Sequence, residues 1–144
     1  MRAFLRRLTA NAAEADDLAQ DAFVKAYRAH ASLASTEAAR TWLFRIAYRT
    51  FLDARRRSDR REALMPAQDE TPPAPAPGLR MDVEAALAHL PPDRRACVML
   101  GLGLGHSHRE VAEITGLPLG TVKSHIDRAR TFLRGELSAY EVTP

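Results

Sequence analysis

The chain has 144 residues, with 21 lysines and arginines against 18 aspartates and glutamates, which leaves a formal net charge of +3. A hydrophobic fraction of 46% and a charged fraction of 27% are ordinary for a globular protein, and no apolar run reaches the roughly 18 to 20 residues of a membrane span. Fibrous proteins and proteins inserted in a membrane are therefore excluded. Cys97 is the only cysteine, so an internal disulfide and a cysteine-based zinc site cannot form, and no cofactor is expected.

The charge is distributed unevenly along the chain. Residues 1–62 carry 13 basic and 8 acidic groups, residues 63–93 carry 1 and 5, and residues 94–144 carry 7 and 5. The acidic middle also holds a cluster of five prolines. Proline lacks an amide donor and keeps the residue before it out of the helical conformation. The sequence therefore predicts two small domains, 1–62 and 82–144, joined by an extended, Pro-rich linker over 63–81.

Both halves predict an all-α fold, because apolar residues recur at intervals of three and four and alternating β-branched residues are absent. In residues 16–30 two apolar stripes predict a core-facing helix whose first turn holds Asp16 and Asp17. The two stripes are Leu18, Ala22 and Ala26, and Ala19, Phe23 and Tyr27. The other face is polar and by default a solvated surface; it consists of Asp17, Gln20, Asp21 and Arg28.

A second helix is predicted over residues 37–57, with an apolar face and a stripe of arginines. The stripe consists of Arg45, Arg49 and Arg56, with Trp42 and Tyr48 near its two margins. Aromatic rings beside guanidinium groups can stack unpaired bases while neutralising phosphate. The alternative is that the aromatic residues border the core and the arginines only keep the helix soluble. The five arginines between residues 55 and 61, Arg56 among them, favour an anionic partner, since concentrated like charge repels itself.

The second half predicts four helices separated by glycine and proline. A short helix near residues 83–90 ends at two prolines, and another follows over 94–104. Gly105 suits the position just after a helix, and Ser107 with Glu110 forms a capping box for a helix to Thr115. Gly116 ends that helix, and the last one runs over 118–137. Two helices joined by a tight turn, the second longer and basic, are typical of a helix-turn-helix domain.

The last helix has a predicted buried stripe and a polar face. The stripe consists of Val122, Ile126, Ala129 and Leu133. The outward face consists of Thr121, Ser124, Asp127, Arg128 and Thr131, with Lys123 and Arg130 on a flank. Arginine suits guanine acceptors, aspartate the cytosine amino group and lysine a phosphate, so this face suits the major groove of DNA. The alternative is an ordinary amphipathic helix in a bundle.

Taken together, the two halves resemble the extracytoplasmic-function (ECF) sigma factors, which are small bacterial initiation subunits of RNA polymerase. In the first half, DDLAQDAFVKAYR and TWLFRIAYRTFLDARRR resemble the core-binding and minus-ten segments of region 2. In the second half, LPPDRRACVMLGLGLGHSHREVAEITGLPLGTVKSHIDRARTFLR resembles the minus-thirty-five-reading region 4. The resemblance covers nearly the whole chain. It is specific because the two region 2 segments precede the region 4 segment in this order.

The resemblance implies binding to core RNA polymerase, to promoter DNA and to an anti-sigma factor. It assigns core polymerase binding to Asp17, Gln20, Asp21 and Phe23. It assigns the minus-ten element to Trp42, Arg45, Tyr48, Arg49 and Arg56, with the loop HASLASTEA taking up an extruded base. It assigns the minus-thirty-five element to Lys123, Ser124, Asp127 and Arg128, with Thr121 and Arg130 on phosphates. The helix that precedes LRRLTANAAEADD in the family is expected to be shortened or absent.

The expected function is therefore a cytoplasmic, non-enzymatic transcription initiation factor. Arg49 stands where the family usually has asparagine, and Asp127 places a carboxylate among the base-reading residues. Two other functions remain open, a sigma-like decoy that binds an anti-sigma factor and a stand-alone helix-turn-helix regulator. An enzyme is the least expected class, because the five histidines are scattered and no nucleophile motif or Gly-rich phosphate loop is present.

Overall fold

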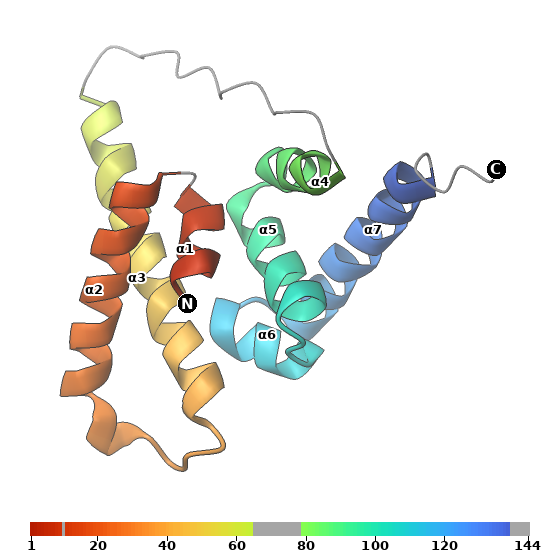
Figure 1. Ribbon diagram of the computed structural model, residues 1–144. Helices are drawn as coiled ribbons and strands as arrows, with labels where there is room; N and C mark the ends of the chain where they lie inside the picture. The colour runs from red at the N-terminus through yellow and green to blue at the C-terminus, as the bar shows by residue number, and fades with distance from the viewer. Residues whose placement is uncertain (10, 65–78, 139–144) are drawn as a thin grey trace. The chain divides into compact units, whose positions relative to one another are not determined.

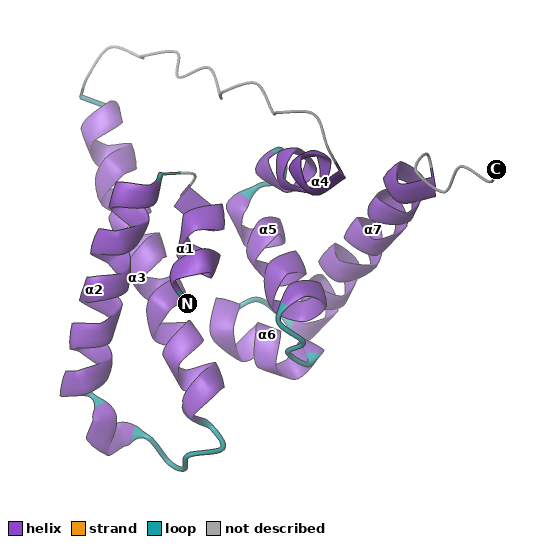
Figure 2. Ribbon diagram, viewed as in Figure 1, coloured by secondary structure: helices purple, strands orange, loops and turns teal. Residues whose placement is uncertain are grey.

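The computed structural model describes residues 1–9, 11–64 and 79–138. These residues form seven α-helices, one 3-10 turn and one π-helical turn, and they contain no strand (Figure 2). The all-α prediction is confirmed. The chain divides into two compact units, Met1–Ala74 and Pro75–Pro144. Most of the predicted linker, residues 65–78, lies outside the described residues, and its last three residues belong to helix α4, Leu79–Ala88.

The first unit consists of α1 (Arg2–Thr9), α2 (Ala12–Arg28) and α3 (Ala39–Glu62) (Figure 1). Helix α2 begins earlier than predicted, because the side chain of Asn11 accepts a hydrogen bond from the Glu14 amide at 3.1 Å and caps the helix. The prediction that Asp16 and Asp17 occupy the first turn is therefore wrong, and Glu14 is the carboxylate in that position.

Helix α1 has only eight residues, and it supplies a large share of the core of the first unit. Its Phe4, Leu5 and Leu8 are buried against α2 and α3. The rings of Phe4 and Phe44 meet edge to face, with centroids 5.4 Å apart, a favourable geometry for two aromatic rings. Facing them, α2 presents mostly alanines, which let the helix backbones approach closely. Helix α1 is thus part of the core of the first unit.

Helix α3 is longer than predicted and continues five residues beyond Arg57. Arginine has a high helix propensity, so the arginine-rich run extends the helix rather than ending it. Residues 55–62 are all exposed, and Figure 1 shows this yellow end of α3 continuing past α1 and α2. The arginine-rich run is therefore a helical extension that does not belong to the packed core.

The second unit consists of α4, α5 (Pro92–Val98), a π-helical turn η2 (Met99–Gly103), α6 (His108–Thr115) and α7 (Leu119–Ser138). The predicted single helix over 94–104 is an α-helix followed by the π turn, because Leu104 donates its amide to the Met99 carbonyl five residues back. The core lies between α5, η2, α6 and α7. Its largest fully buried side chains are Leu100, Val111, Ile114, Val122 and Ile126.

The cap and the turn glycines of the helix-turn-helix were predicted correctly. The Glu110 amide donates to the Ser107 side chain at 3.1 Å, which caps α6. Gly116 has φ of +75° and ends α6, and Gly105 has φ of +73°. Positive φ is a conformation that glycine adopts without steric cost, so these two glycines allow the sharp turns before α6 and α7.

Helix α4 is joined to α5 by one side chain. Arg95 of α5 donates from Nε to the Leu87 carbonyl at 2.8 Å, and from one terminal nitrogen to the carbonyls of Ala88 and Leu90, both at 2.9 Å. These carbonyls lie at and beyond the C-terminal end of α4, where helix carbonyls lack amide partners one turn on; the Leu87 carbonyl also accepts from the Leu90 amide at 3.1 Å. Arg95 thus holds the end of α4 in place.

In the described part of the chain, no helix is long and apolar enough to cross a membrane.

Candidate nucleic-acid interface

One side of α3 carries a stripe of arginines with a single tryptophan. At 100° per residue, the residues within about 40° of Arg49 on this side are Trp42, Arg45, Asp53, Arg56 and Arg60, so the stripe also includes one carboxylate. Trp42 and Arg45 are half-buried, whereas Arg49 and Arg56 are exposed. The opposite side packs into the core through Phe44, Ala47 and Phe51. The structure therefore brings an aromatic ring and a row of guanidinium groups onto one solvent-facing side of a single helix.

Tyr48 does not belong to this surface. It is 2% exposed, and its ring lies against Phe51 with centroids 6.1 Å apart. The prediction that Tyr48 lies at the margin of the stripe is wrong. At 100° per residue Tyr48 is turned about 100° from Arg49, which is far enough round the helix for α1 and α2 to cover it. Tyr48 is therefore a core residue beneath the stripe.

The loop between α2 and α3 lies next to the tryptophan end of the stripe in sequence. It begins with a 3-10 turn, His30–Ser32, and is held by local hydrogen bonds. The Ser32 hydroxyl donates to the Ala29 carbonyl at 2.6 Å, and the Ala38 amide donates to the Ser35 hydroxyl at 3.2 Å. Nearly all of its residues are exposed. A shaped, exposed loop beside a tryptophan can receive a base that has left the double helix.

The outer surface of α2 differs from the prediction. Phe23 and Tyr27 were predicted to face the core, but they are 52% and 79% exposed. The core side of α2 is already filled by Leu18 and by small alanines, so the two aromatic residues remain outside. They adjoin the exposed polar residues Asp17, Gln20 and Asp21. Exposed aromatic side chains are typical of a protein-binding surface.

The two faces of α7 were predicted correctly. Val122, Ile126 and Ala129 are buried and Leu133 is half-buried. The outward face consists of Thr121, which is half-buried, and the exposed Lys123, Ser124, Asp127, Arg128, Arg130 and Thr131. Arg130 lies 4.0 Å from the Asp127 carboxylate, and the Thr131 hydroxyl donates to the Asp127 carbonyl. Both charged groups are about half exposed or more, so this contact leaves them accessible to a ligand.

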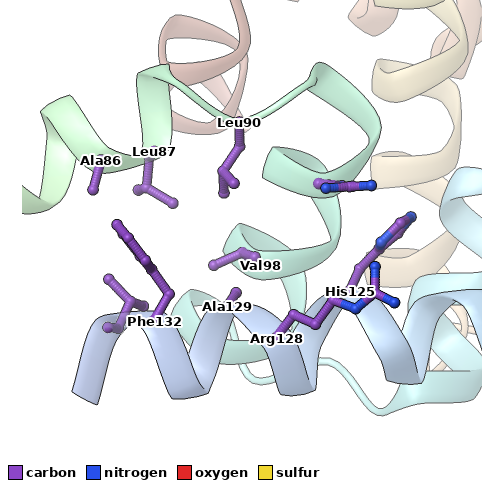
Figure 3. A pocket seen from close by; sticks show the side chains of 10 residues that line it. Ala86, Leu87, Leu90, Val98, His125, Arg128, Ala129 and Phe132 are labelled. Carbon is purple, nitrogen blue, oxygen red and sulfur yellow. The ribbon is translucent and has the colours of Figure 1, made fainter. Parts of the chain in front are cut away.

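A groove of about 190 Å³, which sequence reasoning missed, lies beside this face, between α4, α5 and α7 (Figure 3). Its walls are mostly apolar, and Phe132 in it is 51% exposed. Arg128 and His125 lie at one end of the groove, and Arg94 also lines it. Helix α4 forms one wall of this groove, so the groove could not be predicted from the apolar periodicity of α7. Arg128 therefore borders both the outward face of α7 and an apolar groove.

Cys97 lies in the core of the second unit and is not a candidate nucleophile. Burial is the larger cause and the nearby negative charge of Asp93 the smaller; together they raise the pKa of its thiol from about 9 to about 12. At pH 8 the thiolate fraction should be about a thousandfold lower than that of a free cysteine. We expect a disulfide reagent to leave the native protein unlabelled over minutes and to label it at once in denaturant. Rapid stoichiometric labelling of the native protein would contradict this burial.

The sign of the pH effect follows from the direction of this shift. The folded state holds the Cys97 proton more tightly than the unfolded state, so protonated Cys97 favours folding. This stabilisation is fully present below about pH 9. It is lost as the pH rises from about 9 towards about 12. A Cys97→Ser control should remove this alkaline loss, which urea unfolding at pH 8 and pH 10 can measure.

Comparisons with known proteins agree with this geometry. The family model for Sigma-70 region 2 matches residues 1–61, and that for Sigma-70 region 4 matches residues 80–133. The ECF RNA polymerase sigma factor SigE of Mycolicibacterium smegmatis is 37% identical over 93% of this chain, and SigM of Mycobacterium tuberculosis is 36% identical over 90%. The chain spans 56% of the length of SigE and 67% of that of SigM.

Two solved structures are similar to this fold. The sigma factor RpoE from Bartonella quintana, in a complex with the anti-sigma factor NepR, has a TM-score of 0.77 and 30% identity; the match covers 95% of this chain and 89% of that one. CnrH, in a complex with the cytosolic domain of CnrY, has a TM-score of 0.62 and 27% identity, covering 94% of this chain and 79% of that one.

Proposed function

This chain belongs to the extracytoplasmic-function sigma factors of RNA polymerase, and from this premise we propose that it directs core polymerase to promoters through three surfaces. The observation that carries the proposal is the pair of basic faces in the two units. One is the tryptophan and arginine stripe of α3, and the other is the outward face of α7. The first suits unpaired bases and the second suits duplex DNA.

In the first unit, we assign the minus-ten element to the exposed stripe of α3 and the adjacent loop. The contacting residues are Trp42, Arg45, Arg49 and Arg56, and Tyr48 supports them from the core. Unstacking a base step costs a few kcal/mol, and stacking on an aromatic ring returns about 1 to 3 kcal/mol per base. The protein would therefore open DNA by capturing bases that have become unpaired, while the polymerase performs the chemistry.

In the second unit, we assign the minus-thirty-five element to the outward face of α7. Lys123, Ser124, Asp127 and Arg128 would read base edges, and Thr121 and Arg130 would hold phosphates. Arg128 is exposed and can make two hydrogen bonds to guanine, whereas Asp127 can accept one from cytosine. Replacing Arg128 should therefore relax the preference at one base pair, whereas replacing Arg130 should weaken binding to all sequences alike.

The outer surface of α2 is the proposed contact with core polymerase. It consists of Asp17, Gln20, Asp21 and Phe23, and the exposed Tyr27 extends it. A second protein partner is an anti-sigma factor, because the solved structures of RpoE and CnrH are complexes, the first of them with a named anti-sigma factor. Since the proposed partners act on chromosomal DNA, the protein would work in the cytoplasm and catalyse no reaction of its own.

The proposal is tested by reconstituted transcription with the host's core RNA polymerase and a library of promoter fragments. Phe23→Ala should weaken polymerase binding by tenfold or more, because a large, exposed aromatic side chain is the kind of residue that dominates interfaces. Phe132→Ala is the matched control, since Phe132 is 51% exposed and lies in the other unit. Its polymerase affinity should stay within twofold.

The outcome of this experiment separates the competing functions. New, chain-dependent transcript starts support the proposal. Failure of the wild-type chain to bind polymerase would contradict it and favour the decoy. Tight, specific binding of duplex DNA by the chain alone would favour a stand-alone helix-turn-helix regulator.

A further inference from the structure

The C-terminal extension of α3, residues 55–62, has more charge than its fold requires. It carries five arginines, Arg55, Arg56, Arg57, Arg60 and Arg61, against Asp59 and Glu62. All eight residues are exposed, so the arginines cover no apolar core. Like charges four residues apart on a helix destabilise it by about 0.2 to 0.5 kcal/mol per pair, and this run has two such pairs. The same rule gives two opposite-charge pairs, Asp53 with Arg57 and Arg55 with Asp59, so the charge of the extension brings little net stabilisation to the helix.

Internal contacts account for little of this charge. Arg56 lies 3.8 Å from the Asp53 carboxylate, but the two side chains are 69% and 53% exposed, and such surface pairs are worth little. Arg60 and Arg61 lie in the last turn, where cations complement the helix dipole by about 0.3 to 1 kcal/mol. The dipole effect does not reach back to Arg55–Arg57, and it does not depend on which side of the helix an arginine occupies.

The side of the helix is what distinguishes these arginines. Arg56 and Arg60 follow Arg49 by 7 and 11 residues, which places both within about 20° of it. Arg55 and Arg61 are each turned about 120° away. The stripe that begins at Trp42 therefore continues on one side to Arg60, over about 27 Å at 1.5 Å per residue. This length corresponds to about eight base pairs of DNA at 3.4 Å per base pair.

The chemistry changes along the stripe. Trp42 at its N-terminal end is the stripe's aromatic residue, and residues 52–62 contain none. A surface of guanidinium groups without aromatic rings suits phosphates better than it suits unpaired bases. The N-terminal part thus suits single-stranded DNA, and the C-terminal part suits the backbone of DNA that is still paired.

We propose that Arg60, together with Arg56, grips the phosphates of the duplex directly upstream of the captured minus-ten bases. This inference rests on the proposed function. The upstream direction is part of this proposal, and the position of the base pairs in the test DNA examines it. The contact is independent of base sequence, so it would strengthen every promoter complex alike and hold the junction between paired and unpaired DNA along one rigid helix.

The test uses holoenzyme and two synthetic DNAs. One is a single-stranded minus-ten oligonucleotide, and the other is the same strand joined to twelve upstream base pairs of arbitrary sequence. The variant is Arg60→Gln, and the matched control is Arg61→Gln, which removes the same charge from the same last turn on another side. On the duplex-bearing DNA, Arg60→Gln should weaken binding about fivefold and reduce the slope of log affinity against log salt by about 0.9. Arg61→Gln should change the slope by less than a third of this.

Charge reversal provides a second comparison. Arg60→Glu should weaken binding of the duplex-bearing DNA by tens of fold, clearly more than Arg61→Glu, and both should leave the single-stranded oligonucleotide bound with wild-type affinity. Equal losses in the two variants would overturn the proposal and leave only a diffuse charge effect, and equal losses on both DNAs would overturn the assignment to duplex. If wild-type holoenzyme bound neither DNA, the proposed function itself would fail, and that result is distinguishable from either outcome.

Discussion

Replacing Ile126 by alanine should unfold the second unit and leave the first folded. Ile126 is completely buried, and a Cβ atom added at Gly101 would stand only 2.7 Å from its Cδ1, so the side chain packs directly against the π turn. Truncating such a residue costs about 2 to 5 kcal/mol. A unit of some sixty residues has a total stability of about 3 to 9 kcal/mol at 0.05 to 0.15 kcal/mol per residue. The loss is therefore comparable to the whole stability of this unit.

The chain allows the two units to be followed separately. Trp42, the only tryptophan, lies in the first unit, so its fluorescence reports on that unit alone, whereas circular dichroism reports on both. Ile126→Ala should lose about half of the helical signal at 25 °C and keep the wild-type unfolding midpoint of Trp42 in urea. Leu102→Ala is the control, because Leu102 is 38% exposed, and it should behave like the wild type. A common shift of both signals would show that the units unfold together.

Replacing Trp42 by alanine should reduce promoter opening by about 5- to 150-fold. This range corresponds to the 1 to 3 kcal/mol that one stacked base contributes. The change removes no charge, so the salt dependence of binding should stay the same, whereas Arg45→Gln should lower the salt slope by just under one. Permanganate reactivity of thymines in the minus-ten element measures opening directly.

Trp42→Phe is the conservative variant in this test. A phenyl ring still stacks, so it should recover most of the opening lost in Trp42→Ala. If Trp42→Ala opened promoters as well as the wild type, Trp42 would not belong to the base-capturing site. The arginines of α3 would then be the residues of the stripe that contribute to opening. Equal weakening of opening and of closed-complex binding would instead indicate a structural role in unit 1.

The faces of α7 could be predicted from sequence because that helix is long, its apolar period is regular, and glycine and proline mark the turn before it. The environments of Tyr48, Phe23 and Tyr27 could not. Whether a residue at the border of an apolar stripe is buried depends on how closely the neighbouring helices approach. In the first unit, alanines of α2 set that distance, so Tyr48 is covered and the two aromatic residues of α2 are not.

The end of α3 was mispredicted for a different reason. The predicted helix ends at Arg57, inside the arginine-rich run, although arginine favours helix and each residue adds only a small cost of repulsion. The groove beside Arg128 has no signal in the sequence of α7, because α4 forms one of its walls. Helix positions that depend on distant segments are the part of this fold that local periodicity does not determine.

The way Arg95 holds α4 has a consequence for protein engineering and for recombination between relatives. One guanidinium group satisfies the carbonyls of Leu87, Ala88 and Leu90, a task that needs several donors on one planar group. A chimera joined between α4 and α5 would lose these hydrogen bonds if the parent that supplies α5 had no arginine at position 95, or if its α5 packed differently against the foreign α4. Exchange points that keep these two helices on the same parent lie before Leu79, and swapping the whole second unit there should preserve its DNA-reading specificity.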